Sequence, residues 1–352
     1  MTAQTDQPYF ILFANCIPVK GATRSVICDI QRYNYDFIPN ALYDMLTEEL
    51  HKPVREIAAS YGEDNIDTVL EYFEYLEEKE YGFFGSDEER ALFPNLNLEW
   101  DHPSLVTNAI MDIDAGTRVE WVEAFARQLD EARCEAMDIR IYQAIPPDTL
   151  AQIVNCFKRH TIESIMLYLP WAPDYEALYD GLCQNLRLKQ IVVHGCPTPE
   201  DHSSRIRKNN LVFIKKAIDS HTHCGAVSPN YFSPNKMLFT ESQKHNSCLN
   251  RKVSMDTAGY LCQCPSMPAR FGHIDQTLIK NIISEQDFSQ VWHVHKDQID
   301  TCKDCEFRHI CTDCRAWRKN EDMLSKPDKC HYDPYSAEWL SPEKEIVTEN
   351  TP

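Results

Sequence analysis

Seven of the chain's cysteines recur between residues 248 and 330 at spacings that are typical of metal sites. The spacing is Cys248-x10-Gly259-x4-Cys264, then Cys302-x2-Cys305-x5-Cys311-x2-Cys314, and finally Cys330. A turn between two cysteines at x2 spacing points both sulfurs to one side, so both thiolates can reach one metal centre. Four cysteines within thirteen residues are too dense for a hydrophobic core. We therefore predict that this segment binds a metal cofactor.

The residue types alone leave zinc and iron–sulfur chemistry open, since both use sets of four thiolates. The N-terminal residues lack the basic start and apolar run of a secretion signal, and we expect no transmembrane helix. We therefore expect a cytoplasmic protein, in which clustered cysteines favour metal binding over disulfides. The cysteines that lie inside apolar stretches are instead predicted to be buried packing residues: Cys16, Cys28, Cys134, Cys156 and Cys183.

The cysteine pattern resembles the SPASM domain, which carries auxiliary [4Fe–4S] clusters at the C-terminus of radical SAM peptide-modifying enzymes. The resemblance covers about residues 246–330. It implies that the second cluster is bound by Cys302, Cys305, Cys311 and Cys330, and that three ligands of the first are Cys248, Cys264 and Cys314. Gly259 is expected to supply the turn that brings Cys264 back toward Cys248.

The first cluster of the resemblance lacks one ligand. The family places three residues before its equivalent of Cys314, and here there are two. The family's additional upstream cysteine would fall near Ser242, where the chain has none. The missing ligand could be His245 or Cys262, one iron could stay open, or the first cluster could be absent.

The catalytic motif of radical SAM enzymes is missing. Such an enzyme needs a Cys-x3-Cys-x2-Cys triplet after the first barrel strand, where three thiolates hold the cluster that binds SAM. Here the first α/β strand, over residues 106–113, runs through residues 114–117 directly into a predicted helix. No cysteine lies between Cys28 and Cys134, so we expect no ordinary radical SAM catalysis and leave open whether the protein is an enzyme.

The N-terminal hundred residues predict a small winged-helix-like unit. Residues 8–39 read as three short strands, and three helices follow, with Asn40 as an N-cap, Pro53 in a first turn and a third helix from Asn65. This order resembles the RiPP recognition element, a domain that binds the leader peptides of ribosomally made natural products. The resemblance implies that a leader adds as a strand beside the third strand, against the third helix. A purely structural domain is the alternative.

From about residue 104 the pattern changes to alternating strands and helices. Apolar runs at residues 106–113, 137–144, 164–170 and 189–195 alternate with helical stretches at 118–133, 147–160 and 175–186. This rhythm predicts an α/β fold with a parallel sheet, either open or a partial barrel. Residues 211–218 and the stretch around residues 224–232 are candidates to continue it.

Several other polar residues have ligand-like or catalytic chemistry. The weaker metal candidates are His221, His223 and Cys224. Pocket candidates follow strand ends, where α/β folds keep their active sites: Asp112, Asp114, His194 and Cys196. His293 and His295 are expected on a solvated loop, and no Gly-rich phosphate loop or HExxH motif occurs.

The whole arrangement resembles the SPASM-domain peptide maturases of "grasp-with-spasm" clusters, which accompany an ATP-grasp ligase and a precursor peptide in graspetide biosynthesis. It implies a leader-recognition domain at 1–100, a degenerate radical-SAM-like partial (β/α) barrel at 101–240, a SPASM domain at 241–335 and a flexible tail at 336–352. The net charge of −19 excludes a general nucleic-acid binder and is compatible with a basic peptide.

Three functional hypotheses follow from these observations. The first is an accessory protein with one or two [4Fe–4S] clusters that binds the precursor leader and assists the ATP-grasp ligase. The second is an iron–sulfur redox enzyme that acts directly on the peptide, since cluster potentials span roughly −700 to +450 mV. The third replaces iron with zinc and makes the chain a structural adaptor.

Overall fold

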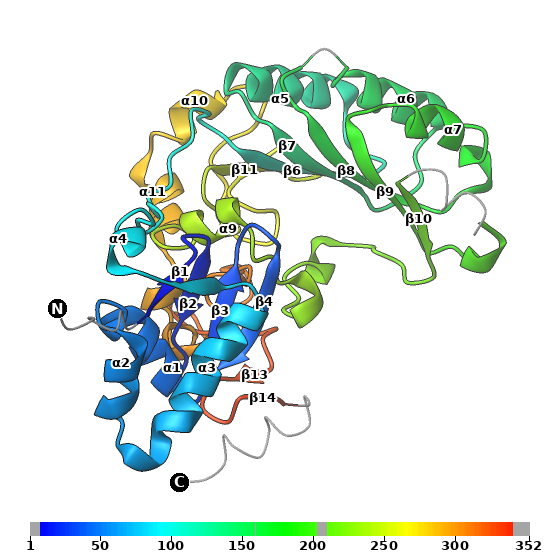
Figure 1. Ribbon diagram of the computed structural model, residues 1–352. Coiled ribbons are helices and arrows are strands. Elements are labelled where there is room, and N and C mark those ends of the chain that lie inside the picture. Colours follow the sequence, from blue (N-terminus) through cyan, green and yellow to red (C-terminus); the bar gives the residue numbers. More distant parts are fainter. Residues whose placement is uncertain (1–7, 159, 203–209, 341–352) are drawn as a thin grey trace, which may run out of the picture.

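The computed structural model describes residues 8–158, 160–202 and 210–340. Its largest element is a seven-stranded sheet of order β10-β9-β8-β7-β6-β11-β12, shown in Figure 1. Neighbouring strands are parallel, except for the antiparallel pair β11 and β12. The strands are β6 (Asn108–Ile113), β7 (Ala136–Ile141), β8 (Ser164–Pro170), β9 (Leu188–His194), β10 (Leu211–Ile214), β11 (Lys252–Met255) and β12 (Leu261–Cys262). The predicted α/β class is confirmed.

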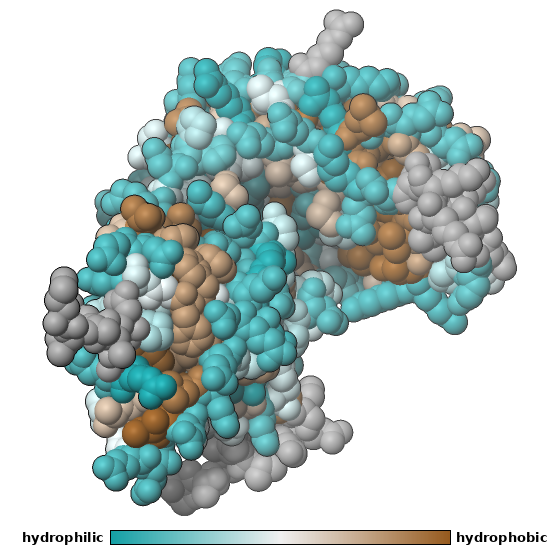
Figure 2. Space-filling model, in the orientation of Figure 1, coloured by the Kyte–Doolittle hydropathy of each residue, from teal (hydrophilic) through white to brown (hydrophobic). Residues whose placement is uncertain are grey.

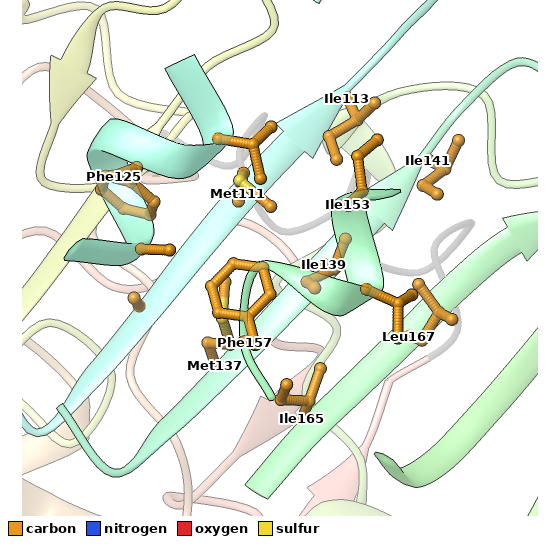
Figure 3. Packing of buried hydrophobic residues seen from close by; sticks show 14 of the residues in the cluster. Met111, Ile113, Phe125, Met137, Ile139, Ile141, Ile153, Phe157, Ile165 and Leu167 are labelled. Carbon is orange, nitrogen blue, oxygen red and sulfur yellow. The ribbon is translucent and has the colours of Figure 1, made fainter. Parts of the chain in front are cut away.

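Helices between the strands cover one face of this sheet. They are α5 (Val119–Glu131), α6 (Pro147–Asn155) and α7 (Tyr179–Cys183), and they lie along the outer side of the arc in Figure 1. In Figure 3, Phe125 of α5 and Ile153 of α6 pack onto residues of the strands such as Ile139. Each such side chain is fully buried, which stabilises the fold by about 1.5–3 kcal/mol. The third helix is shorter than predicted.

The opposite face of the sheet carries polar side chains. Successive strand residues point to opposite faces, so the neighbours of the core residues Met111 and Ile139 point away from the helices. Asp112 of β6, Arg140 of β7 and Tyr168 of β8 are register partners across this face. Figure 2 shows that the molecule is hollowed between this sheet and the N-terminal region. We call this side of the sheet the open face.

The stretch after β10 does not continue the sheet as expected. It forms 3-10 turns at His221–His223 and Pro229–Tyr231. Between these turns, Gly225 has φ +89°, a backbone conformation that β-strands do not use. This segment is therefore a loop with two short 3-10 turns that connects the sheet to the cysteine-rich region.

The N-terminal region has more strands than the three predicted. They are β1 (Tyr9–Leu12), β2 (Cys16–Val19), β3 (Ser25–Asp29), β4 (Asn34–Ile38) and β5 (Gly82–Gly85). The apolar run at residues 8–19 breaks at a turn in which the Cys16 N–H donates to the Phe13 carbonyl (2.9 Å). As a result β1 pairs with the distant β5, while β2, β3 and β4 form a separate antiparallel sheet.

The helices of this region are α1 (Asn40–Asp44), continued by a π-helical turn over Met45–Glu49, then α2 (Val54–Ser60), α3 (Ile66–Glu78) and α4 (Asp87–Arg90). Asn40 is not the N-cap that we predicted, because Pro39 takes that position. The Asn40 side chain instead accepts a hydrogen bond from the Ser25 hydroxyl (2.6 Å) and so ties α1 to β3.

The three-stranded sheet lies between these helices and the cysteine-rich region. Ile27 and Ile38 belong to a buried cluster with helical residues that include Phe73. Val26 and Cys28 belong to a second cluster that contains Phe307, Ile310 and Cys311. The N-terminal sheet therefore shares a hydrophobic core with the segment that carries the predicted second-cluster cysteines.

The cysteine-rich region has little regular structure. Its helices are α9 (Lys236–Glu241), α10 (Ile279–Ile282) and α11 (Gln286–Ser289), and its last strands are β13 (Tyr332–Asp333) and β14 (Glu338–Trp339). Part of the predicted flexible tail is therefore a strand, since β14 pairs with β13, and residues 341–352 lie outside the described residues. None of the helices described is long and apolar enough to cross a membrane.

Candidate metal centres

The structure places four of the predicted ligand cysteines around one cavity, which we call the second site. Its lining includes Cys302, Cys305, Cys311 and Cys330. Cys302 begins a 3-10 turn that Cys305 closes, with the Cys305 N–H donating to the Cys302 carbonyl (3.0 Å). This tight turn accounts for the x2 spacing, because it directs both sulfurs to the same cavity.

The walls of the second site are largely apolar. Aromatic side chains of Phe232, Phe307, Tyr332 and Trp339 line the cavity. Burial raises the pKa of Cys302 to about 12 and also raises the pKa of Cys311. These cysteines therefore remain neutral thiols at neutral pH unless a metal displaces their protons.

A buried lysine lies against the second site. Lys296 lines the same cavity, is 5% exposed, and its Nζ donates to the Cys311 sulfur (3.2 Å). Burial favours its neutral form, but the charges of Cys311 and Cys302 hold the pKa of Lys296 above its ordinary value. A buried ammonium is costly without a negative partner. The buried position of the Lys296 ammonium is thus favourable when the cysteines are thiolates, which is their state when they bind metal.

The other predicted cysteines gather in a second group, which we call the first site. Cys248 packs against a buried cluster that contains Cys264. Besides burial, the charges of Cys248 and Cys264 contribute to raising the pKa of Cys314 to about 12, which places all three close together. Gly259, at φ +83°, forms the expected turn between β11 and β12.

The first site also has a buried lysine. Lys252 of β11 is 9% exposed and its Nζ donates to the Cys248 sulfur (3.5 Å). Burial opposes its charge, whereas Cys248 and Cys264 raise the pKa of Lys252. Each cysteine group therefore combines buried sulfurs with one buried ammonium.

The two residues that the sequence offered as the missing ligand make other contacts, although Cys262 lies two residues before Cys264, and burial and then the charge of Cys264 raise the pKa of Cys262. The His245 ring contacts Trp100 (5.3 Å) and His293 (5.4 Å) between ring centroids. Cys262 lies in β12, where its thiol donates to the Ser254 carbonyl (3.7 Å). Instead, the loop around Cys224 approaches the group: a Cβ atom on Gly225 would lie 2.9 Å from the Cys314 sulfur.

Sequence reasoning treated Cys224 as a weak candidate because it was expected at the edge of a strand. The available signal was the Cys224-Gly225 pair itself, since glycine after a ligand often permits a tight approach of the backbone. The neighbouring histidines have other roles. His221 stacks on Trp317 (6.3 Å between centroids), and His223 pairs with Asp219 (2.8 Å).

Neither group is a preformed site for one metal ion. Within residues 8–158, 160–202 and 210–340, no three His, Cys, Asp or Glu side chains are arranged to hold a single ion. A closed zinc site needs four donors at about 2.0–2.3 Å from one ion. A [4Fe–4S] cluster binds each thiolate at a different iron, so its sulfurs surround a larger volume. Four cysteines around one cavity supply the donor set that either kind of centre uses.

The carboxyl ends of the sheet strands form a separate polar cavity, which we call the edge cavity. It is lined by Asp112, Asp114, Tyr142, Asp256, Arg270 and neighbouring residues, with an empty volume of about 670 Å³. Asp112 accepts hydrogen bonds from Arg140 Nε (2.6 Å) and the Tyr142 hydroxyl (2.9 Å). The structure therefore places Asp112 and Asp114 at one cavity, as expected for strand ends.

The link from β6 to α5 is a tight turn at this cavity. The Gly116 N–H donates to the Asp114 carboxylate (2.8 Å), and the Thr117 hydroxyl donates to the Thr257 carbonyl (2.9 Å). With β6 ending at Ile113 and α5 beginning at Val119, this link has no loop of the length that a cysteine triplet needs.

The remaining candidates do not join a site. His194 is buried and its Nε2 bonds the Ile141 carbonyl (3.0 Å), and Cys196 is fully buried; neither lines the edge cavity. His293 is exposed, and His295 lies 3.5 Å from Asp297. Of the five predicted packing cysteines, Cys156 and Cys183 are only half-buried, and the other three are buried.

Comparison with known proteins gives little further information. No protein-family model matches the chain, and no curated protein matches it. One solved structure, native anSMEcpe with bound AdoMet, is similar at 12% sequence identity, covering 69% of this chain and 100% of that one. The TM-score of this match is 0.36, so the structural similarity is distant.

Proposed function

We propose that this chain is a SPASM-type maturation protein for a ribosomally made peptide. It binds the leader of the precursor with its N-terminal domain and holds [4Fe–4S] clusters in its cysteine-rich region. It assists a partner ATP-grasp ligase, which performs the modification. The cysteine spacing, the strand order of the N-terminal region and the absence of the SAM-binding triplet together support this proposal.

The observation that carries the proposal is the second site. Four cysteines converge on an apolar cavity, and a buried lysine donates to one of their sulfurs. A bound [4Fe–4S] cluster supplies one-electron redox capacity and joins the segments that ligate it. Here Cys302, Cys305 and Cys311 come from one segment and Cys330 from the next, while Lys296 offsets part of the thiolate charge. A structure of this kind makes cluster binding part of the folding of the region.

The N-terminal sheet offers an edge for peptide binding. β4 pairs with β3, and the described residues place no strand on its other side. Tyr33 is 71% exposed and Phe37 is 46% exposed at this strand. Burial, and then the Asp36 carboxylate of β4, raise the pKa of Tyr75 on α3, so helix and strand lie side by side. An extended leader can add its backbone hydrogen bonds at such an edge.

The position of β4 also supports a link between peptide and metal. Its Tyr35 ring lies 5.8 Å from the Phe307 ring, between centroids, and Phe307 lines the second site. A leader on β4 would therefore lie one layer of side chains from the cluster. This arrangement favours a role in which metal loading shapes the peptide-binding surface.

The test has a metal arm and a peptide arm. Anaerobic reconstitution of the full chain with iron and sulfide, followed by iron, sulfide and zinc analysis, is expected to give iron and sulfide in equal amounts. The leader segment of the precursor is expected to bind in a calorimetric titration, and a sequence-scrambled peptide of the same composition is not. If the protein contains zinc and no sulfide, the cluster model is rejected in favour of the zinc-bound adaptor. If the leader does not bind, with or without the ligase, the peptide-binding role is rejected.

Direct redox action on the peptide is a second candidate, favoured by the placement of the first site near the open face of the sheet. The charge of Asp138 on that face acts on Lys252. If this candidate is correct, the mass of the precursor changes under reducing anaerobic conditions without the ligase. If the mass of the precursor stays unchanged, with and without SAM, direct redox action is rejected and the accessory role is retained.

A further inference from the structure

We propose that Cys224, from the loop after β10, is the fourth thiolate ligand of the first site, completing the set with Cys248, Cys264 and Cys314. The inference rests on the proposed function, since it concerns the cluster that the first site would hold. It replaces the sequence candidates His245 and Cys262. Each of the four thiols would release its proton when its sulfur binds iron.

The backbone next to Cys224 touches the Cys314 side chain. A Cβ atom on Gly225 would lie 2.9 Å from the Cys314 sulfur and 2.8 Å from Trp317 Cδ1, closer than real Cβ atoms approach. Gly225 also has φ +89°, which L-residues rarely adopt. Glycine at this position thus lets the chain bring Cys224 against the segment that carries Cys314.

The loop is fixed to both neighbouring ligand turns. The Ser266 hydroxyl donates to the His221 carbonyl (3.2 Å), and Ser266 follows Cys264 by two residues. On the other side, Lys329 Nζ donates to the Cys224 carbonyl (2.6 Å) and lies 4.6 Å from the Trp317 ring centre. These contacts hold residues 221–225 at the mouth of the first site.

The electrostatics of the group agree with this placement. Burial raises the pKa of Cys248 most, Lys252 lowers it, and the charge of Cys224 raises it again. After burial, the charge of Cys224 also contributes to raising the pKa of Cys264. By contrast, the charges that lower the pKa of His245, after burial, come from His293, Arg251 and His295 rather than from a cysteine. Cys224 therefore acts on two of the ligand cysteines, and Cys262 interacts with the neighbouring Cys264 only, whereas no cysteine is among the main causes for His245.

A ligand from this loop changes where the first site lies. Cys224 is exposed, and its charge also reaches Arg140 and Tyr168 on the open face of the sheet. The Nη2 atom of Arg140 is buried and, among the described residues, has no hydrogen-bond partner. The first site would therefore join the open face of the α/β sheet to the cysteine-rich region.

The experiment compares Cys224→Ala with Cys262→Ala and His245→Ala in the full chain, after anaerobic reconstitution with iron and sulfide. Wild-type protein with both sites filled holds about eight irons, four for each cluster. We expect Cys224→Ala to lose either one iron, with the signal of a three-iron cluster in oxidised samples, or all four irons of the first site. The two control variants should keep the wild-type iron content and electron paramagnetic resonance spectrum.

Folding is checked by circular dichroism, and the exposed position of Cys224 makes a folded variant the expected result. The same three variants are also made in a Cys305→Ala background. Because that background removes a ligand of the second site, the remaining iron reports on the first site. Wild-type iron and spectra in Cys224→Ala would overturn the inference, as would loss of iron in Cys262→Ala or His245→Ala alone. If the wild-type chain holds two clusters and Cys224→Ala keeps both, only this inference fails, whereas a wild-type chain without iron and sulfide rejects the proposed function itself.

Discussion

The buried lysines are the single residues that tell most about the charge of the cysteine groups. Lys252 and Lys296 each donate to one cysteine sulfur, at 3.5 and 3.2 Å. Against the effect of burial, one carboxylate also raises the pKa of each lysine, Asp138 for Lys252 and Asp313 for Lys296, but the neighbouring cysteines act more strongly. Thiolates bound to metal therefore offset the loss of hydration of the ammonium better than neutral thiols do, so these residues suit a loaded site. They also provide a way to tune the cluster, since nearby charge and hydrogen bonds to sulfur set its potential.

Replacing Lys296 with Met should lower the midpoint potential of the second-site cluster, because the reduced cluster loses a favourable positive neighbour. We expect a shift on the order of 60 mV, equivalent to about 1.4 kcal/mol for one electron. A redox titration of the reconstituted protein measures it. Lys303→Met is the matched control, as this lysine is next to Cys302 but exposed. Equal potentials in both variants would show that the ammonium of Lys296 does not influence the cluster.

His194 predicts a pH dependence of stability. Burial lowers its pKa below the ordinary 6.5, and its ring accepts a hydrogen bond from the Ile218 N–H (3.2 Å). Because the unfolded chain binds the proton more strongly, this contribution to stability is present above pH 6.5 and is lost as pH falls below it. In chemical denaturation, His194→Gln should lessen this loss, by up to about 1.4 kcal/mol per pH unit. His51→Gln, at an exposed position in the N-terminal region, is the control variant.

At the scale of elements, short turns rather than helices position the cysteines. Cysteine sulfurs are positioned by three short segments: the 3-10 turn at Cys302–Asp304, the Gly259 turn and the loop at residues 221–225. The regular strands only hold the ends of such segments in place. Two of these segments depend on glycine at positive φ, where a side chain is strained. The precision of both sites therefore depends on backbone conformation.

Gly225→Ala tests this dependence. The added Cβ would approach the Cys314 sulfur to 2.9 Å at an unfavourable φ, so the loop must move. We expect a loss of about 1–3 kcal/mol in the free energy of unfolding and reduced iron at the first site. Gly181→Ala is the control, since nothing lies within 4 Å of its Cβ position in α7. That change should keep full iron and stabilise by roughly 0.5–1 kcal/mol. Full loading of Gly225→Ala would contradict the tight approach.

For the whole molecule, the central feature is that the N-terminal sheet and the second site share one core. Arg24 links them: its Nε donates to Glu306 Oε1 (2.9 Å), and its guanidinium stacks 3.7 Å above the Phe37 ring. The Glu306 side chain is buried and also accepts from the Tyr332 hydroxyl (2.5 Å). We therefore expect leader binding at β4 and metal binding at the second site to affect each other.

Arg24→Met should weaken this connection, because it leaves the buried Glu306 carboxylate without its cation. We expect about 2 kcal/mol lower stability, less than for a fully buried pair because Arg24 is 33% exposed on its side chain. Thermal unfolding of the full chain measures the change. Lys20→Met, which removes an exposed pair with Asp44, should leave the unfolding temperature close to that of the wild-type chain. Similar melting of the two variants would show that the Arg24 contact contributes little.

The sequence by itself determined the α/β class and the positions of most strands after residue 104, since buried parallel strands need continuous apolar runs. It also marked Cys302 and Cys305 of the second site, because their x2 spacing is a local property of a turn, whereas Cys311 and Cys330 follow from the resemblance of the whole pattern. The metal that they bind, the peptide role and the domain limits stay predictions.

Only the tertiary structure decided which distant segments meet. Sequence reasoning joined β1 and β2 in one strand, but β1 pairs with β5, more than sixty residues later along the chain. The sequence likewise offers Cys224 only as a weak candidate, although the fold brings the adjoining Gly225 against Cys314, eighty-nine positions away. Local spacing reports on turns and on strand periodicity, whereas such pairings follow from how the whole chain buries its apolar surface.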